Sequence, residues 1–197
     1  VTVANLAMAV AQTDKKVLLI DADMRKPVQH KCFRLSNKVG LSDVITGDKP
    51  LDKALNRNVT GSLDVLTSGT IPPNPSELLA SRQMKELLET LKERYDMILI
   101  DCAPINVVSD VAGLSQEIAG VVMVVHYGST TYPELDDAVN RLALANCNVL
   151  GFAVNEVSSK HGSGYYSNYK YKYKYKYDYQ YGSAKQAEEK KKAGSAC

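Results

Sequence analysis

The chain has 197 residues, 45% of them hydrophobic and 23% charged, which is the composition of an ordinary globular domain. The apolar stretch 121–125 is far shorter than the ~20 residues that a membrane-spanning helix needs. Tyrosine dominates the aromatic residues, with 12 Tyr, 2 Phe and no Trp. The composition therefore argues against a membrane-spanning chain, and the tyrosines need an explanation other than core packing.

The net charge of +2 hides two oppositely charged parts. Residues 160–197 contain nine Lys and three acidic residues, whereas residues 1–159 contain 15 basic and 19 acidic residues. We therefore predict a mildly acidic globular body, residues 1–159, followed by a Tyr/Lys-rich tail, residues 160–197, that lacks core-forming residues and is disordered. Nine of the 12 tyrosines lie in this tail, at Tyr165, Tyr166, Tyr169, Tyr171, Tyr173, Tyr175, Tyr177, Tyr179 and Tyr181.

Short apolar runs alternate with helical patterns along the body. Strands are predicted at 17–20, 63–66, 95–101, 121–125 and 149–154. Residues 1–10 have the pattern of a helix interior, without a cap in front of them. Strands that alternate with helices predict βαβ units, so we expect an α/β fold with a mostly parallel sheet and helices on both faces.

Two further helices are predicted in more detail. One has Asn74 as its N-cap, Pro75 at its first position and Glu77 closing a capping box. Its apolar residues follow at helical spacing, at Leu78, Leu79, Met84, Leu87, Leu88 and Leu91. The other helix covers 132–145 and is predicted to turn Leu135, Val139, Leu142 and Ala143 inward.

The four cysteines give little information about function. Cys32, Cys102, Cys147 and Cys197 are widely spaced, without a Cys-x-x-Cys pair or a histidine at ligand spacing. We therefore expect small, mostly buried thiols rather than disulfides or a zinc site.

Acidic side chains follow two of the predicted strands. Asp21 and Asp23 come after the first strand with Arg25 close behind, and Asp101 ends the third strand. In open α/β sheets, ligands bind at the carboxyl ends of the strands. Mg²⁺ typically takes one or two carboxylates together with waters and phosphate oxygens. These residues therefore predict a metal and phosphate site; the alternative is that the acids cap turns or stay solvated and that Arg25 lies on the surface.

Several of these segments resemble bacterial tyrosine kinases. Residues 18–27, LLIDADMRKP, resemble the Walker A′ motif of that family, and residues 97–104, MILIDCAP, resemble its Walker B motif. Residues 68–79, with the sequence PPNPSELL at their end, are similar to the segment between the two motifs, and residues 150–155 are similar to the last core strand. A C-terminal tyrosine cluster is the other mark of the family. The resemblance implies a P-loop NTPase fold of the deviant Walker, MinD-like kind.

One motif of the family is absent from this sequence. The Gly-rich Walker A loop, which ends in Gly-Lys-Ser/Thr, is not found, and residues 1–7 resemble the helix that follows it. We therefore expect residues 1–159 to be a partial P-loop kinase domain, truncated just after Walker A and lacking its first strand. Such a chain is expected to be inactive as given; a natural pseudokinase is the alternative.

The resemblance implies ATP and Mg²⁺ as cofactors and assigns roles to individual residues. Asp21, Asp23 and Asp101 would be catalytic residues and metal ligands, and Asp21 would also accept the proton of the incoming tyrosine. Arg25 would contact phosphate or a neighbouring subunit. Asn155 would contact adenine, although a structural role at the strand end is equally compatible with the sequence.

The tail tyrosines would be the phosphoacceptors, modified in trans within a ring-shaped homo-oligomer. Each phosphate adds about −1.5 to −2 charges, so full modification would reverse the sign of the tail and favour dissociation. Tyr-Lys alternation leaves three other readings open: a self-associating β-strand, binding of single-stranded nucleic acid, and a solubilising tail. We expect no nucleic-acid partner.

The resemblance also implies a cellular role, partners and a location. The resemblance implies control of capsular or extracellular polysaccharide synthesis and export, a membrane activator of the polysaccharide co-polymerase kind, and a cognate tyrosine phosphatase. The location implied is cytoplasmic, at the inner face of the cell membrane. Two other functions stay open: a MinD/ParA-type ATPase, and a non-enzymatic regulatory partner that another kinase phosphorylates.

Overall fold

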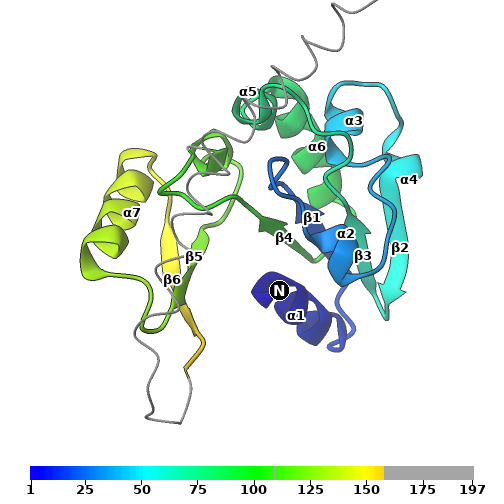
Figure 1. The fold of residues 1–197 in the computed structure, drawn as a ribbon. Coiled ribbons are helices and arrows are strands. Elements are labelled where there is room, and N and C mark those ends of the chain that lie inside the picture. The colour runs from blue at the N-terminus through cyan, green and yellow to red at the C-terminus, as the bar shows by residue number, and fades with distance from the viewer. Residues whose placement is uncertain (109, 158–197) are drawn as a thin grey trace, which may run out of the picture.

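Strand β1 (Val17–Asp21) lies inside a four-stranded sheet in the computed structural model, which describes residues 1–108 and 110–157 (Figure 1). It pairs in parallel with β3 (Leu63–Leu66) and with β4 (Met97–Asp101). The edge strand β2 (Leu55–Thr60) is antiparallel to β3. All five predicted strands are present, whereas β2, with its polar residues 56–58, was not predicted.

A second sheet is formed by β5 (Val121–His126) and β6 (Val149–Asn155), which are parallel and joined by helix α7 (Tyr132–Leu144). Within the described part of the chain, β4 pairs only with β1, and β5 only with β6. The expectation of a further strand before Val1 stays a prediction. One face of the β5–β6 sheet is apolar and about half exposed, at Val122, Val124, Leu150, Phe152 and Val154.

Helices cover both faces of the larger sheet, as predicted. Val17 and Leu19 of β1 pack with α1 (Thr2–Ala11) in one buried cluster. Leu18 and Ile20 point to the opposite face and pack with α6 (Arg82–Lys92) in another. Because alternate residues of a strand point to opposite faces, the unbroken apolar run of β1 is what a strand covered on both sides requires.

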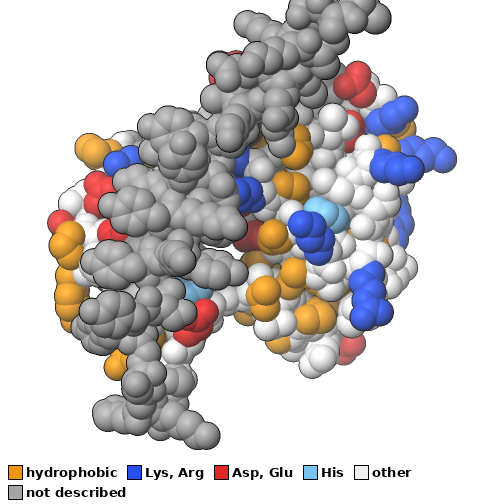
Figure 2. All heavy atoms as spheres, in the orientation of Figure 1, with side chains coloured by type: hydrophobic (Ala, Val, Ile, Leu, Met, Phe, Trp, Pro, Cys, Tyr) orange, Lys and Arg blue, Asp and Glu red, His pale blue; other side chains and the backbone are white. Residues whose placement is uncertain are grey.

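Short helices connect these elements near the carboxyl ends of the strands. They are α2 (Gln29–Cys32), α3 (Leu41–Ile45), α4 (Leu51–Ala54), α5 (Pro75–Leu79) and the 3₁₀ helix η1 (Asp110–Leu114). Lys and Arg side chains are spread over the side of the molecule where α2, α3 and α4 lie (Figure 2).

The long helix predicted from Asn74 is in fact two helices. Asn74 is the N-cap of α5 and Pro75 its first residue, as predicted, but the capping box is wrong: the Asn74 side chain donates to Glu77 Oε2 (2.5 Å) and makes no cap hydrogen bond. The helix ends at Leu79, and Ser81 begins α6 by accepting a hydrogen bond at Oγ from the Met84 N–H (3.2 Å). An N-capping serine inside the apolar pattern is the physical reason for the break.

Two smaller expectations also need correction. In α7 the buried residues are Ala138 and Leu142, whereas Ala143 is exposed. The cysteines Cys32, Cys102 and Cys147 are free, as expected, but only Cys147 is buried and Cys32 is exposed. In the described ranges no helix is long and apolar enough to cross a membrane. Cys197 and the nine tail tyrosines lie outside the described residues.

Candidate functional site

Asp21 and Asp101 are register partners at the ends of the parallel strands β1 and β4. The backbone N–H of Ala22 donates to the carbonyl of Asp101 (2.8 Å), which extends the pairing one residue beyond β1. Both carboxylates follow apolar runs that the core holds in place. The predicted meeting of two acids at one sheet edge is thereby confirmed.

The segment after β1 folds back over Asp21. Oδ2 of Asp21 accepts hydrogen bonds from the backbone N–H groups of Val28 (3.1 Å) and Gln29 (2.9 Å). Oδ1 is also buried but has no hydrogen-bond partner among the described residues. Burial raises the pKa of Asp21 to about 7; the N–H of Gln29 opposes this rise, and the charge of Asp101 adds to it.

Asp101 is held from the side by an amide. Nε2 of Gln29 donates to Oδ2 of Asp101 at 2.5 Å. Burial raises the pKa of Asp101, and the Gln29 hydrogen bond lowers it.

Asp23 lies in the turn that follows. Its Oδ1 accepts hydrogen bonds from the backbone N–H groups of Arg25 (3.2 Å) and Lys26 (2.9 Å). Its negative charge raises the pKa of both Asp21 and Asp101, so it lies close enough to act on the acid pair. The turn therefore uses part of the carboxylate as a structural cap.

Arg25 is held by two residues that sequence reasoning missed. Its Nη2 donates to Ser76 Oγ (2.9 Å), and its guanidinium lies 3.4 Å from both carboxylate oxygens of Asp110. The Ser76 hydroxyl donates to Oδ1 of Asp110 (2.5 Å), whose side chain is fully buried. Sequence reasoning offered one signal for this cluster: Ser76 lies within residues 68–79, the segment that resembles the kinase family.

Asn155 lies at the end of β6, as predicted, and its side chain is already engaged. Nδ2 of Asn155 donates to Oγ1 of Thr2 at the start of α1 (2.5 Å). This contact connects the second sheet to α1, the helix that packs against the larger sheet. Thr2 is thus the partner of Asn155 in a structural role at the end of the strand. The contact of Asn155 with adenine stays a prediction.

The acid pair fits a hard divalent cation in its chemistry. Carboxylate oxygens are the ligands that Mg²⁺ prefers, and two suffice when waters and phosphate oxygens supply the rest. Oδ1 of Asp21 is an unpaired buried oxygen at this position. Across the described residues no group of three or more His, Cys, Asp or Glu side chains is placed to hold a metal by itself. Any metal here would therefore depend on ligands beyond these side chains.

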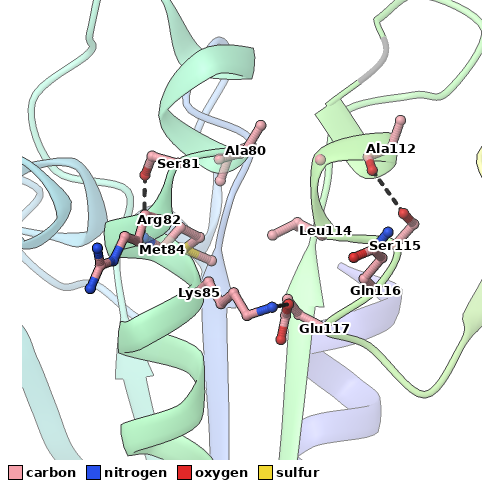
Figure 3. Close-up of a pocket in the computed structure, with 12 residues that line it drawn as sticks. Ala80, Ser81, Arg82, Met84, Lys85, Ala112, Leu114, Ser115, Gln116 and Glu117 are labelled. Atoms are coloured by element: carbon pink, nitrogen blue, oxygen red, sulfur yellow. Dashed lines mark hydrogen bonds and ion pairs between the residues drawn. The ribbon is translucent and has the colours of Figure 1, made fainter.

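A separate pocket of about 420 Å³ lies between the start of α6 and the segment around η1 (Figure 3). Lys85 and Glu117 form an ion pair across it, with Nζ and Oε1 2.9 Å apart. Asp21, Asp101 and Arg25 are not among its lining residues. We therefore place the candidate site at the acid pair and not in this pocket.

The fold and this site define a class of protein. A family model described as "AAA domain" matches residues 1–130, and the solved structures that the chain resembles have the P-loop NTPase-like α/β fold. Within this class, the chain belongs to the bacterial tyrosine-protein kinases.

Two relatives and one structure illustrate the family, and a second structure shares its fold. Tyrosine-protein kinase YwqD of Bacillus subtilis is 44% identical over 167 residues, which cover 84% of this chain and 70% of YwqD. A Klebsiella pneumoniae relative, whose name describes a tyrosine-protein kinase in the cps region, is 38% identical over 157 residues. These residues cover 80% of this chain and 22% of that protein. The chain thus spans only about a fifth of this longer relative.

The Escherichia coli Etk kinase domain has a TM-score of 0.76 and 38% identity, covering 81% of this chain and 63% of that one. MinD of Pyrococcus horikoshii has a TM-score of 0.66 and 23% identity, covering 81% of this chain and 65% of that one. At that identity MinD shares the fold alone.

Proposed function

We propose that this chain is part of the catalytic domain of a protein-tyrosine kinase whose intact form transfers the γ-phosphoryl group of ATP to tyrosine, including the tyrosines of its own tail in trans. Without a Walker A loop, the chain as given is inactive. The observation that carries the proposal is the pair of Asp21, which is buried, and Asp101, which is half-buried, at the ends of two parallel strands, with one Asp21 oxygen unpaired. Membership of the tyrosine-kinase family supports the reaction type.

The cofactors proposed are ATP and Mg²⁺. When bound, they supply the phosphoryl group and neutralise its charge, and phosphoryl transfer depends mostly on such positioning and neutralisation. Asp21 and Asp101 are the residues that would hold the metal, with Asp23 acting from the adjoining turn. Arg25 would act from its cluster with Ser76 and Asp110 by keeping this turn in place.

Asp21 is also the residue proposed to take the proton of the acceptor tyrosine. A tyrosine hydroxyl has a pKa near 10, so little phenolate exists at neutral pH without a base. Burial raises the pKa of Asp21 to about 7 when no metal is bound. This value is closer to the pKa of a tyrosine hydroxyl than the pKa of an ordinary aspartate is.

The tail and the cellular setting belong to the same proposal. Tyr165 to Tyr181 would be phosphoacceptors in a homo-oligomer whose stability depends on their modification. A role in capsular or extracellular polysaccharide synthesis is supported by the cps name of the Klebsiella relative. We propose a membrane activator and a tyrosine phosphatase as partners, and a cytoplasmic location at the inner face of the membrane.

The test is a phosphorylation assay with protein made from the complete coding sequence. Purified protein is incubated with ATP and Mg²⁺, and phosphotyrosine is mapped by mass spectrometry. We expect modification of the tail in the wild type and a loss of at least ~100-fold in Asp21→Asn. Mixing Asp21→Asn with a wild-type protein that lacks residues 160–197 separates reaction in trans from reaction in cis.

Three outcomes would count against the proposal. ATP hydrolysis without phosphotyrosine would indicate an ATPase of the MinD/ParA kind. Phosphotyrosine that persists in purified Asp21→Asn and Asp101→Asn proteins would indicate a contaminating or separate kinase, with this protein as its target. An equal oligomer size for modified and unmodified protein in light scattering would reject the proposed effect on assembly.

A further inference from the structure

Gln29 joins the two carboxylates of the acid pair. It is the first residue of α2 and is fully buried, although its side chain is polar. Its backbone N–H donates to Oδ2 of Asp21 at 2.9 Å, and its side-chain Nε2 donates to Oδ2 of Asp101 at 2.5 Å. One residue from the loop after β1 thus holds an acid on its own strand and an acid on the neighbouring strand.

An amide suits this position because it donates hydrogen bonds without adding charge. A lysine or arginine here would neutralise the carboxylates and compete with a cation, and an acid would repel them. The Gln29 amide instead fixes one oxygen of Asp101 and leaves its negative charge available. Since the contact spans 72 residues of sequence, it depends on the folded path of the loop.

Two buried oxygens of this network have no partner in the described part of the chain. They are Oδ1 of Asp21 and Oε1 of Gln29. An unsatisfied buried polar atom costs about 1–3 kcal/mol, so such atoms are uncommon without a reason. Two of them in one hydrogen-bonded network indicate a polar occupant, and oxygen atoms are what a hydrated divalent cation binds.

We propose that Gln29 is a positioning residue of the phosphoryl-transfer site, which sets the orientation of Asp101 relative to Asp21 for a hydrated divalent cation. This inference rests on the proposed function. Residues that orient metal ligands from the outer shell typically contribute about 10- to 100-fold in metal affinity or activity. Gln29 therefore has a measurable role although it does not bear a charge.

The test uses Gln29→Leu in the complete protein, with Lys31→Ala as a matched control on the exposed side of the same helix. Mn²⁺ binding in the presence of ADP is measured by electron paramagnetic resonance, together with kcat, KM for ATP and the melting temperature. For Gln29→Leu we expect Mn²⁺ affinity and kcat to fall about tenfold, with KM for ATP and the melting temperature close to wild type. Lys31→Ala should match the wild type in all four.

Gln29→Asn is the second variant and guards against a folding defect. It keeps the amide but is one methylene too short to reach Asp101, so we expect the same loss of Mn²⁺ affinity. Mn²⁺ affinities within twofold of wild type in both variants would overturn the inference. So would a loss that follows the melting temperature in both variants, because that indicates a purely structural residue. Absence of phosphotyrosine in the wild type would reject the proposed function, while Mn²⁺ binding would still test Gln29.

Discussion

The guanidinium of Arg25 lies 3.4 Å from the carboxylate of Asp110, a residue 85 positions further along the chain. Ser76 bonds to both, so the loop after β1, helix α5 and helix η1 meet at one buried carboxylate. The turn that carries Asp23 is thereby connected to the loop that follows Asp101. This contact makes Arg25 part of the scaffold of the site.

Removal of the buried partner should therefore cost stability. Asp110→Ala leaves the guanidinium without its carboxylate, and breaking a buried pair costs about 3–5 kcal/mol. Because the Arg25 side chain is 23% exposed, water compensates part of this, and we expect a loss of about 2–3 kcal/mol in urea unfolding. Arg82→Ala, which breaks an exposed pair with Glu86, should change stability by less than about 1 kcal/mol. Equal effects of the two variants would contradict the structural role of Asp110.

The raised pKa of Asp21 predicts a pH dependence of stability. Its folded-state pKa is about 7 and its ordinary value 3.8, so the folded state binds the proton more tightly. This contribution to the free energy of unfolding is complete below pH ~4 and is lost as the pH rises through ~7, on the order of 4 kcal/mol in total. The measurement is urea unfolding between pH 4 and 8 in EDTA. Asp21→Asn, which cannot titrate there, should lack this part of the slope; identical slopes would refute the assignment.

Asp21→Asn should raise the stability of the protein and lower its kinase activity. Burial raises the free energy of the charged Asp21 carboxylate, and Asp21→Asn removes this charge. We therefore expect a larger free energy of unfolding at pH 8. Kinase activity of the complete protein should fall at least ~100-fold. A loss of both stability and activity would instead show that the carboxylate is needed for folding. Calorimetry and the phosphorylation assay on one preparation distinguish these results.

The break between α5 and α6 predicts the effect of a capping mutation. Ser81→Ala removes the Oγ acceptor for the Met84 N–H and should cost about 1 kcal/mol. Thr90→Ala is the matched control on the same helix, since Thr90 is exposed and alanine is a better helix former. Thermal unfolding should show a lower melting temperature for Ser81→Ala alone. An unchanged value would mean that Ser81 does not act as the cap.

The strands and their acids were predictable because local patterns encode them. The apolar runs that end in Asp21 and Asp101 specify parallel strands, of which β1 is buried on both faces and β4 is half-buried. Parallel neighbours bring their carboxyl ends to one edge of the sheet. Gln29 and Asp110 could not be predicted, because their partners lie 72 and 85 residues away and the loops between them have no periodic signal. The edge strand β2 was missed for a related reason, since residues 56–58 are polar and tertiary pairing overrides their low strand propensity.

The hydrogen bond between Asn155 and Thr2 holds the end of β6 against the start of α1. Val157, two residues beyond Asn155, is the last residue that the structure describes before the nine tyrosines. A fully extended chain covers about 3.5 Å per residue, so Tyr165 can reach at most ~30 Å from Val157 and Tyr181 at most ~80 Å. Tethering of this kind gives effective concentrations in the millimolar range wherever the linker can span the distance. Chain length alone thus ranks the tyrosines by the largest distance from Val157 that each of them can reach.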